Sequence, residues 1–508
     1  MGFQLSPQQQ AVIDWVKNGK GSMNLIARAG CGKTSTLMEI AKVIKGSGFM
    51  GAFNKSIAEE FTERLKAQRS FNVQGRTIHS AGMAAWSKVA RGVRIDSYKV
   101  RGLAKGISSW DRKLQGVICD TVGYAKQACL GVETSFSESC HWQEIIEYYD
   151  LADEIPAGIR PERLIEMCIE VYWQSLELCE EVVDFDDMLL APLYHKAPLQ
   201  KYDWVLVDEA QDTNLARRLI VFGMLNGSSR MVCVADPAQS IYGFAGASSD
   251  STKLIEEEMK KRGEFTELPL SVTYRCPKAV VALANQWVPD IQAHESAPKG
   301  LVTEMSHVDF WGQNFLPNDV ILCRNSRPLV GIAQRLRDQG IQCVVEGMSS
   351  KGLKALAVKW GEELSIGEFL RELDAYQQRE VQKWTEKKNE EKVEAVNNKC
   401  GIMIDICERL RESDPVSKIV QRIDFLFGGA GYKVLTLCTI HKSKGREWNR
   451  VYLIGRNRYM PSMWAKKDWE IQQEDNLAYV AVTRAKVELV EVEVPFKKKG
   501  DDREWWEL

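Results

Sequence analysis

Residues 27–34, with the sequence ARAGCGKT, have the composition and spacing of a loop that binds phosphate groups. They follow an apolar run at residues 24–26 and open a segment whose apolar residues recur at helical spacing. A strand, a glycine-rich turn and a helix in this order aim backbone N–H groups and the positive end of the helix dipole at a phosphate. We expect the Lys33 ammonium to reach the β and γ phosphates and the Thr34 hydroxyl to hold Mg²⁺. The predicted phosphate-binding residues are Ala29, Gly30, Cys31, Gly32, Lys33, Thr34 and Ser35.

A second motif, residues 205–212 with the sequence VLVDEAQD, places two carboxylates at the end of an apolar strand. The carboxyl ends of parallel strands form the edge at which open α/β sheets bind ligands. At that edge Asp208 can hold Mg²⁺ through water, and Glu209 can polarise an attacking water as a general base. The alternative is that both acids only complement the dipole at a helix N-terminus. The phosphate loop upstream favours the catalytic interpretation.

The segments around these motifs alternate between strand-like and helical patterns, which is typical of a parallel α/β sheet. Ser6 is placed to cap the first helix, and Asn54 to cap a helix that follows the apolar stretch at 48–53. Residues 85–182 are mostly helical in pattern, and residues 347–428 are helical and highly charged. We therefore predict two α/β domains, each interrupted by a helical insertion. The predicted parts are 1–84 with 183–265 for the first α/β domain, 85–182 for its insertion, 266–346 with 429–495 for the second, 347–428 for its insertion, and 496–508 for a C-terminal tail.

The composition is that of a globular protein and gives no general sign of nucleic-acid binding. Of 508 residues, 67 are basic and 69 acidic, so any nucleic-acid site must be a local groove. No apolar run approaches the ~20 residues of a membrane span, and the first ten residues do not resemble a signal peptide. The 13 cysteines form no C-x-x-C pair and no Cys/His cluster at metal-binding spacing. We interpret them as thiols of a reducing compartment and expect a cytoplasmic protein.

The order of the motifs resembles that of the UvrD/Rep-type superfamily 1 DNA helicases, from Leu5 to about Lys486. Several ordered motifs at compatible spacings are far more specific than any one of them. The resemblance implies that the two α/β domains are RecA-like P-loop motor domains with parallel sheets. The matching stretches are the N-terminal glutamine motif, the phosphate loop, FNK at 53–55, TIHS at 77–80, DEAQD at 208–212, ADPAQSIYGFAGA at 235–247, LSVTYR at 270–275, TIHKSKGREW at 439–448 and LAYVAVTRA at 477–485.

The resemblance also implies how this chain would bind and hydrolyse ATP with Mg²⁺. In such a site, positive charge from the second motor domain completes the environment of the γ-phosphate, so the cleft closes on ATP and opens after hydrolysis. Arg275 and Arg484 match the arginines that supply this charge. The remaining implied contacts are Gln9 with the adenine edge, Tyr274 with the adenine face, Glu447 with the ribose and Gln239 with the γ-phosphate.

The track implied by the resemblance is single-stranded DNA, which proteins grip by phosphate contacts and by stacking aromatic rings on bases. Tyr242 and Phe244 match the positions that stack on bases, although burial in a core is the ordinary role of an aromatic residue. Between residues 455 and 474, where relatives carry a strand-separating hairpin, Tyr459, Met460 or Trp464 could stack on a duplex junction. The full set of implied DNA contacts is Phe53, Asn54, Thr77, His79, Tyr242, Phe244, Arg324, Asn325, His441 and Met460.

Two positions and one segment depart from the family pattern. Ala235 stands for a glycine, and Ala245 stands where relatives often carry an arginine. Ala27 replaces the first glycine of the usual phosphate loop, but alanine is common at that position in the family that the chain resembles. The acidic and arginine positions are intact, so we expect ATP hydrolysis to be retained. The insertion at 347–428 is much shorter than the 2B accessory domain of larger members, and its charges are typical of a solvated helical hairpin or a partner site.

The sequence therefore predicts an ATP-dependent DNA helicase that moves 3′→5′ in replication, recombination or repair. The expected partners are single-stranded DNA and single-strand/duplex junctions, with no membrane and a monomeric state. The basic, tryptophan-rich tail is either a partner-binding peptide or a frayed terminus. Two alternatives stay open: a translocase that displaces proteins from DNA with little unwinding, and a non-enzymatic DNA-binding remnant. A nuclease fusion is disfavoured because few residues follow Arg484.

Overall fold

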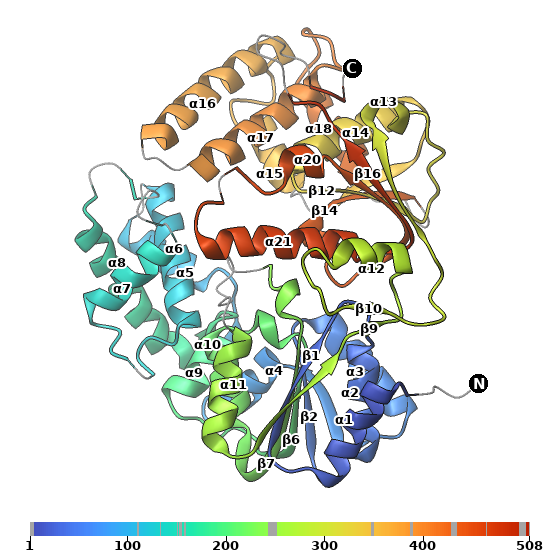
Figure 1. Ribbon diagram of the computed structural model, residues 1–508. Helices are drawn as coiled ribbons and strands as arrows, with labels where there is room; N and C mark the ends of the chain where they lie inside the picture. Colours follow the sequence, from blue (N-terminus) through green and yellow to red (C-terminus); the bar gives the residue numbers. More distant parts are fainter. Residues whose placement is uncertain are drawn as a thin grey trace. The chain divides into compact units, whose positions relative to one another are not determined.

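The fold was analysed in a computed structural model, and the described chain forms two compact units, Met1–Ser271 and Val272–Leu508 (Figure 1). Among the described residues, no helix is long and apolar enough to cross a membrane. The residues described are 5–108, 111–132, 134–149, 151, 155–156, 159–241, 251–346, 350–386, 390–427, 434–463, 465–496 and 504–506.

The first unit is built on a six-stranded sheet with the order β3-β2-β6-β7-β1-β8, and every described pairing in it is parallel. Helices cover both faces, so its central strands are apolar on both sides. In β6, Val205 and Val207 face one buried cluster, while Trp204 and Leu206 face the other. The strands are β1 (Ser22–Ala27), β2 (Gly48–Ala52), β3 (Val73–Thr77), β6 (Tyr202–Val207), β7 (Leu225–Ala235) and β8 (Phe265–Leu270).

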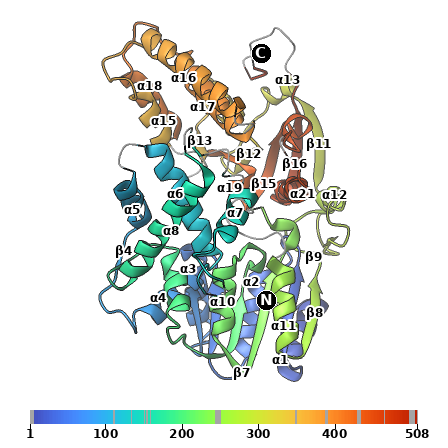
Figure 2. The ribbon, with the colours of Figure 1, turned by 90° about the vertical axis from the view of Figure 1, so that its left-hand side faces the viewer.

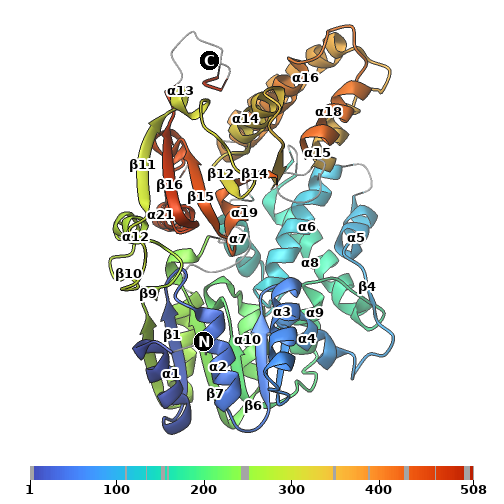
Figure 3. The same ribbon diagram turned by 90° about the vertical axis from the view of Figure 1, so that its right-hand side faces the viewer.

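Figures 1 and 3 show α1, α2 and α3 on one face of this sheet and α10 and α11 on the other. Side-chain oxygens cap the N-termini of several of these helices. Ser6 and Gln9 form a capping box at α1, and Asn54 accepts from the Ile57 N–H at α3. Both caps were predicted from the sequence. The helices are α1 (Pro7–Asn18), α2 (Lys33–Val43), α3 (Lys55–Ala67), α4 (Ile78–Trp86), α9 (Asp187–Tyr194), α10 (Leu215–Gly223) and α11 (Ser251–Arg262), with short turns η3 (Ala210–Asp212) and η4 (Pro237–Gln239).

The residues between α4 and α9 form mainly helices, which lie together in Figure 2. Two short strands pair in parallel at the ends of this segment. Its core contains a buried ion network rather than only apolar side chains: Lys126 bonds Asp184 at 2.6 Å and Asp187 at 2.7 Å, and Lys99 bonds Asp187 at 2.7 Å. The elements are β4 (Arg94–Ile95), α5 (Lys99–Ile107), α6 (Arg112–Gln127), α7 (Ser139–Tyr148), α8 (Pro161–Glu177), η2 (Leu178–Glu180) and β5 (Val182–Val183).

The second unit contains another six-stranded sheet, with the order β11-β16-β15-β12-β14-β13 and parallel pairing throughout the described strands. A two-residue ladder, β9 with β10, precedes it. Two parallel α/β sheets confirm the predicted fold class. The strands are β9 (Val272–Thr273), β10 (Gln292–Ala293), β11 (Leu301–Ser306), β12 (Asp319–Cys323), β13 (Cys343–Glu346), β14 (Leu435–Thr439), β15 (Trp448–Ile454) and β16 (Ala485–Glu493).

The helices of residues 350–427 pack into the same core as helix α14 of the second unit. Phe369, Met403 and Ile419 are fully or almost fully buried in that core. Figures 1 and 2 show α16 and α17 as adjacent helices, within the segment where the charge pattern favoured a helical hairpin. The helices are α12 (Lys278–Ala284), α13 (His307–Phe310), α14 (Ser326–Asp338), α15 (Ser350–Ala357), α16 (Ile366–Glu386), α17 (Glu390–Cys407), α18 (Ser417–Phe427), α19 (Ile440–Ser443), α20 (Arg456–Tyr459) and α21 (Asp468–Val482).

The structure corrects the predicted boundary between residues 265 and 266. Strand β8 at 265–270 pairs with β1, so it belongs to the first sheet, and the boundary falls after Ser271. The strand contains Pro269, which lacks the N–H of a ladder bond, and β8 tolerates it because it lies at the edge of the sheet.

For residues 504–506, the structure also corrects both interpretations of the C-terminal tail, the partner-binding peptide and the frayed terminus. Trp505 and Trp506 are buried in the core of the second unit. The indole N–H of Trp505 donates to the Tyr459 hydroxyl at 3.1 Å, and Glu504 pairs with Arg327 at 3.1 Å. These three residues are therefore part of the folded unit, neither a frayed end nor an exposed peptide.

Replacing Trp506 with alanine is expected to lower the free energy of unfolding of the second unit by about 3 kcal/mol, because a large buried side chain is removed. A Cβ on Gly331 would lie 2.3 Å from the Trp506 ring, so the core is fitted closely around it. Urea denaturation measures the effect. Phe496→Ala is the control, since that ring is 68% exposed and its loss should change stability by less than about 0.5 kcal/mol. Equal effects in the two variants would contradict the burial.

Candidate active site

The phosphate loop of the first unit joins β1 to α2 and has a backbone conformation suited to an anion. Gly30 and Gly32 have φ angles of 72° and 79°, a left-handed conformation that glycine adopts without steric cost. Helix α2 begins at Lys33, and no side chain caps it at Gly32. The N–H groups of the first turn and the helix dipole can therefore be offered to a phosphate.

Lys33 lies among three carboxylates at the carboxyl edge of the first sheet. Its Nζ donates to both carboxylate oxygens of Glu209 at 3.1 Å, and Asp208 and Asp236 act on it electrostatically. Burial opposes the charged ammonium, but the attraction of the carboxylates outweighs burial and raises the pKa of Lys33. Lys33 therefore stays positively charged at neutral pH, as contact with a phosphate requires.

Glu209 has a left-handed backbone conformation with a φ of 49°, which costs a non-glycine residue about 1–2 kcal/mol. Such strain persists where the surrounding structure holds it, often at functional positions. The carboxylate of Glu209 accepts from Lys33 and from the Gln211 side-chain amide. The predicted general base is thus fixed in orientation by two donors.

A chain of hydrogen bonds connects Glu209 with Gln239 through two residues that the sequence analysis did not assign. Gln211 donates to Glu209, and its Oε1 accepts from the Asp236 N–H at 3.0 Å. Asp236 then accepts from the Gln239 amide and pairs with Arg28 at 3.4 Å. Each of these polar residues follows a strand at the carboxyl edge, on β6, β7 or β1. That position was the sequence signal that could have identified Gln211, Asp236 and Arg28.

Asp208 has the properties of a carboxylate that suits a divalent cation. Its Oδ1 accepts from the Glu209 N–H at 2.9 Å, and the residue is buried. Burial and the neighbouring Glu209 carboxylate raise the pKa of Asp208 to about 7. Its ionised form is therefore poorly compensated by the protein alone, and a hard cation with oxygen ligands would stabilise it. Asp208 and the Thr34 hydroxyl fit the oxygen-rich donor set that Mg²⁺ prefers.

Gln9, the predicted adenine contact, uses its side chain to hold the start of α1 and α2 in place. Its Oε1 accepts from the Ser6 N–H at 3.0 Å, and its Nε2 donates to the Thr36 hydroxyl at 3.1 Å. The neighbouring Gln8 bonds both the N–H and the hydroxyl of Ser271. Contact of Gln9 with adenine therefore stays a prediction, and it would require the amide to leave these two partners.

In the second unit, two of the predicted nucleotide contacts, Arg275 and Glu447, are bonded to each other. Arg275 Nε donates to Glu447 at 2.5 Å, and Lys486 lies 3.5 Å from the same carboxylate. Burial favours the protonated acid, yet Arg275 and Lys486 outweigh it and lower the pKa of Glu447. The Tyr274 ring is 48% exposed and contacts His294 with its centroid at 4.9 Å. Glu447 and Lys486 also line a hollow of about 590 Å³.

Arg484, the second arginine that the resemblance assigns to the γ-phosphate, is buried in the second unit. The residue is 1% exposed. Its guanidinium donates to the carbonyl oxygens of Val480 at 2.9 Å and Arg446 at 3.0 Å, and to the Thr483 hydroxyl at 3.2 Å. These bonds connect the end of α21 to the segment that carries Glu447. A role of Arg484 at phosphate stays a prediction that requires the side chain to exchange these partners.

The predicted DNA contacts of the first unit follow β2 and β3. Asn54 and Thr77 act as helix caps, accepting from the N–H groups of Ile57 and Ser80. His79 follows Thr77 by two residues, and burial together with a nearby positive charge lowers its pKa to about 4, so its ring is neutral. The Phe53 ring contacts the guanidinium of Arg217, 4.4 Å away. Tyr242 and Phe244, together with Ala245, lie outside the described residues.

Arg324, one of the predicted contacts of the second unit, is bonded to Glu474. The Oε1 of Glu474 accepts from two nitrogens of Arg324, and its Oε2 accepts from the Ser462 N–H at 3.0 Å. Arg324 also acts with burial to lower the pKa of His441 to about 4. Asn325 precedes α14, Met460 follows α20, and Trp464 lies outside the described residues.

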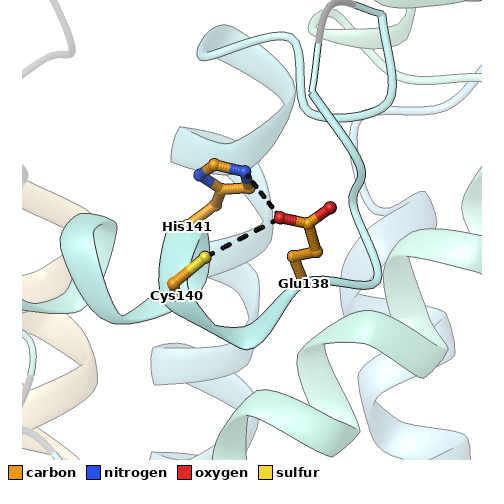
Figure 4. A group of neighbouring side chains, drawn as sticks. All are labelled: Glu138, Cys140 and His141. Atoms are coloured by element: carbon orange, nitrogen blue, oxygen red, sulfur yellow. Dashed lines mark hydrogen bonds and ion pairs between the residues drawn. The ribbon is translucent and has the colours of Figure 1, made fainter.

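A further group of possible metal ligands lies on the surface at the start of α7, away from the residues assigned above. Glu138, Cys140 and His141 offer ligand atoms within 4.8 Å of one another (Figure 4). The sequence analysis missed this Cys/His pair. His141 lies 3.5 Å from Glu138 and 3.7 Å from Glu144, so ion pairs account for the arrangement and we assign no metal to it.

A parallel α/β sheet with a phosphate loop after β1 and acidic residues after β6 defines a P-loop nucleotide site. Comparison with known families identifies which one. Residues 5–260 match the UvrD/REP helicase N-terminal domain, and residues 365–492 match the UvrD-like helicase C-terminal domain. The chain therefore belongs to the UvrD/REP helicase family.

Three curated relatives show how far the similarity extends. The ATP-dependent DNA helicase Rep of Escherichia coli K12 is 25% identical over 304 residues, 56% of this chain and 43% of Rep. The ATP-dependent DNA helicase PcrA of Leuconostoc citreum is 27% identical over 57% of this chain and 40% of PcrA. The F-box DNA helicase protein 1 of Schizosaccharomyces pombe is 24% identical over 96% of this chain and 57% of that protein. The chain thus spans about half the length of these relatives.

Proposed function

We propose that this protein is an ATP-dependent DNA helicase that moves 3′→5′ along single-stranded DNA. The observation that carries the proposal is the connected set Lys33, Glu209, Gln211, Asp236 and Gln239 at the carboxyl edge of the first sheet. In this proposal Lys33 is the phosphate-binding cation, Glu209 the base and Gln239 the γ-phosphate sensor, and the hydrogen-bonded chain that joins them supports these roles. The family to which the chain belongs, with its helicase relatives, supports DNA as the track.

In the proposed hydrolysis, the ammonium of Lys33 moves from Glu209 to the β and γ phosphates of ATP. This exchange frees the Glu209 carboxylate to orient a water and to accept its proton as the water attacks the γ-phosphorus. Gln239 exchanges its bond to Asp236 for one to the γ-phosphate, so the hydrogen bonding of Gln239 depends on the bound nucleotide. Asp208 and Thr34 would hold Mg²⁺, and the ion would neutralise charge on the phosphate oxygens.

We assign to Arg275 and Arg484 the role of stabilising the negative charge that develops on the transferred phosphoryl group. Arg275 would exchange its bond to Glu447 for phosphate, and Glu447 would bind the ribose. Arg484 would exchange its carbonyl partners. With these exchanges, the partners of the two arginines change with the bound nucleotide. A motor needs a change of this kind to couple hydrolysis to motion.

The direction of movement is tested with duplexes that carry a single-stranded tail on one side only. We expect the wild-type protein with ATP to unwind a 3′-tailed duplex and to leave a 5′-tailed or blunt duplex intact, as measured by release of a labelled strand. Glu209→Gln is the control for strand release without hydrolysis. Unwinding of the 5′-tailed substrate alone would refute the proposed polarity.

A second candidate is a translocase that displaces proteins from DNA with little unwinding. The observation that favours it is the packing of α15 to α18 into the core of the second unit, where Phe369 and Ile419 are buried. This insertion is thus joined to the motor sheet and is not a separate accessory domain. Streptavidin removal from a biotinylated oligonucleotide, compared with strand release under the same conditions, distinguishes the two candidates.

A further inference from the structure

Arg217 lies in the first turn of α10 and has fewer hydrogen-bond partners than a guanidinium can use. Its Nη1 donates to the Asp212 carbonyl at 3.0 Å, and its buried Nε has no partner. The carbon centre of the guanidinium lies 4.4 Å from the centroid of the Phe53 ring. A guanidinium in contact with an aromatic face can keep N–H groups available for an anion.

The groups around Arg217 leave its positive charge only partly balanced. Burial lowers the pKa of Arg217, opposed by Asp186 and Asp212. Burial and Asp184 raise the pKa of Asp186 to about 7, so this acid is only a weak counterion near neutral pH. His79 adds no charge, since its pKa lies near 4. The surroundings therefore hold a cation that an additional anion would stabilise.

The topology of the sheet places this group on the side of the predicted DNA contacts. Phe53 follows β2, His79 follows β3, and Arg217 follows β6 through the η3 turn. These three strands are consecutive at one end of the sheet, whereas β1, which leads to the phosphate loop, is separated from β6 by β7. Arg217 thus belongs with the two contacts predicted from the sequence.

We propose that Arg217 binds a phosphate of single-stranded DNA while its guanidinium remains against the Phe53 ring. This inference rests on the proposed function. It adds a cationic contact to the DNA contacts that were predicted from the sequence in this part of the first unit, which are Phe53, His79, Asn54 and Thr77. Stacking on Phe53 limits the motion of the long side chain, so the phosphate contact costs less conformational entropy than one from a free surface arginine. The role is specific to a phosphate and independent of base sequence.

The test measures binding of a fluorescent oligo-dT by anisotropy over a range of salt concentrations. Arg217→Gln is expected to bind about tenfold more weakly at low salt, because a hydrogen-bonded charge pair is lost. The slope of log K against log salt should fall in magnitude by about 0.7, the contribution of one contact to single strands. Thermal unfolding of each variant checks that the fold is retained.

Arg218→Gln is the matched control on the same helix. Arg218 donates to the Thr213 carbonyl at 3.2 Å and to the Ser251 hydroxyl at 3.3 Å, so it makes a similar structural bond away from Phe53. Its slope should equal that of the wild type. If the only role of Arg217 were its hydrogen bond to Asp212, Arg217→Gln would lower the free energy of unfolding and leave the slope of log K against log salt unchanged. This outcome would overturn the inference.

Arg217→Lys keeps the inference testable if the glutamine variant does not fold. Lysine retains the charge but not the planar contact with Phe53. We therefore expect Arg217→Lys to bind oligo-dT more weakly than the wild type, with the same slope of log K against log salt. A lysine variant that binds as tightly as the wild type would overturn the role of stacking. A wild-type protein that does not bind oligo-dT at any salt concentration would instead overturn the proposed function itself.

Discussion

Replacing Glu209 with glutamine is expected to lower the rate of ATP hydrolysis by about 10²–10³-fold, and replacing Lys33 with alanine by at least as much. Glutamine keeps the shape of Glu209 but cannot accept the proton of the attacking water. Lys33→Ala removes the ammonium that is balanced against the two buried carboxylates of Asp208 and Asp236 and the partly exposed carboxylate of Glu209. Release of inorganic phosphate at saturating ATP measures both effects.

The glutamine variant is the decisive one of the two. Loss of Lys33 leaves Asp208, Glu209 and Asp236 without their shared cation, so part of its effect could come from lower stability. Lys42→Ala is the matched control on α2: Lys42 forms an exposed pair with Glu39, worth less than about 1 kcal/mol. Wild-type hydrolysis in Glu209→Gln would contradict the assignment of the base.

Replacing Lys126 with methionine is expected to lower the free energy of unfolding of the first unit by about 3–5 kcal/mol, since it leaves buried acids without their cation. Lys126 bonds Asp184 and Asp187, and none of the three side chains is more than 11% exposed. Lys99 would remain as the only described cation bonded to Asp187. Urea denaturation measures the loss.

An exposed lysine of the same helical segment provides the control for that experiment. Lys105 lies near the end of α5 with an exposed side chain, so Lys105→Met should change stability by less than about 0.5 kcal/mol. The network also ties α6 to the segment that leads into α9, which precedes β6 and Asp208 in the chain. Equal stability of the two methionine variants would show that the buried network does not hold the insertion to the sheet.

The sequence predicted the features that depend on residues close together along the chain. The phosphate loop, the acid after β6, and the caps Ser6 and Asn54 follow from residue types at fixed spacing along the chain. Alternating apolar segments likewise predicted two parallel sheets, because strand and helix each impose their own period. These are interactions between residues a few positions apart.

What the sequence did not show are contacts set by tertiary packing. Gln211 and Asp236 meet because β6 and β7 are neighbours in register, which no local pattern indicates. Lys126 has the residue type of a solvated surface but is buried, since its partners come from a segment about sixty residues away. Burial of Trp506 depends on the absence of a side chain at Gly331, against which its ring packs. The pairing of β8 with β1, which moves the domain boundary past residue 265, is likewise a tertiary contact.

The central claim is that ATP hydrolysis by this chain serves movement on single-stranded DNA. The most direct test is the steady-state rate of ATP hydrolysis measured without DNA, with oligo-dT and with a blunt duplex of equal nucleotide content. The account predicts that oligo-dT raises the rate well above both other conditions, and that Glu209→Gln abolishes the rate in all three. Equal rates with and without oligo-dT in the wild-type protein would contradict it.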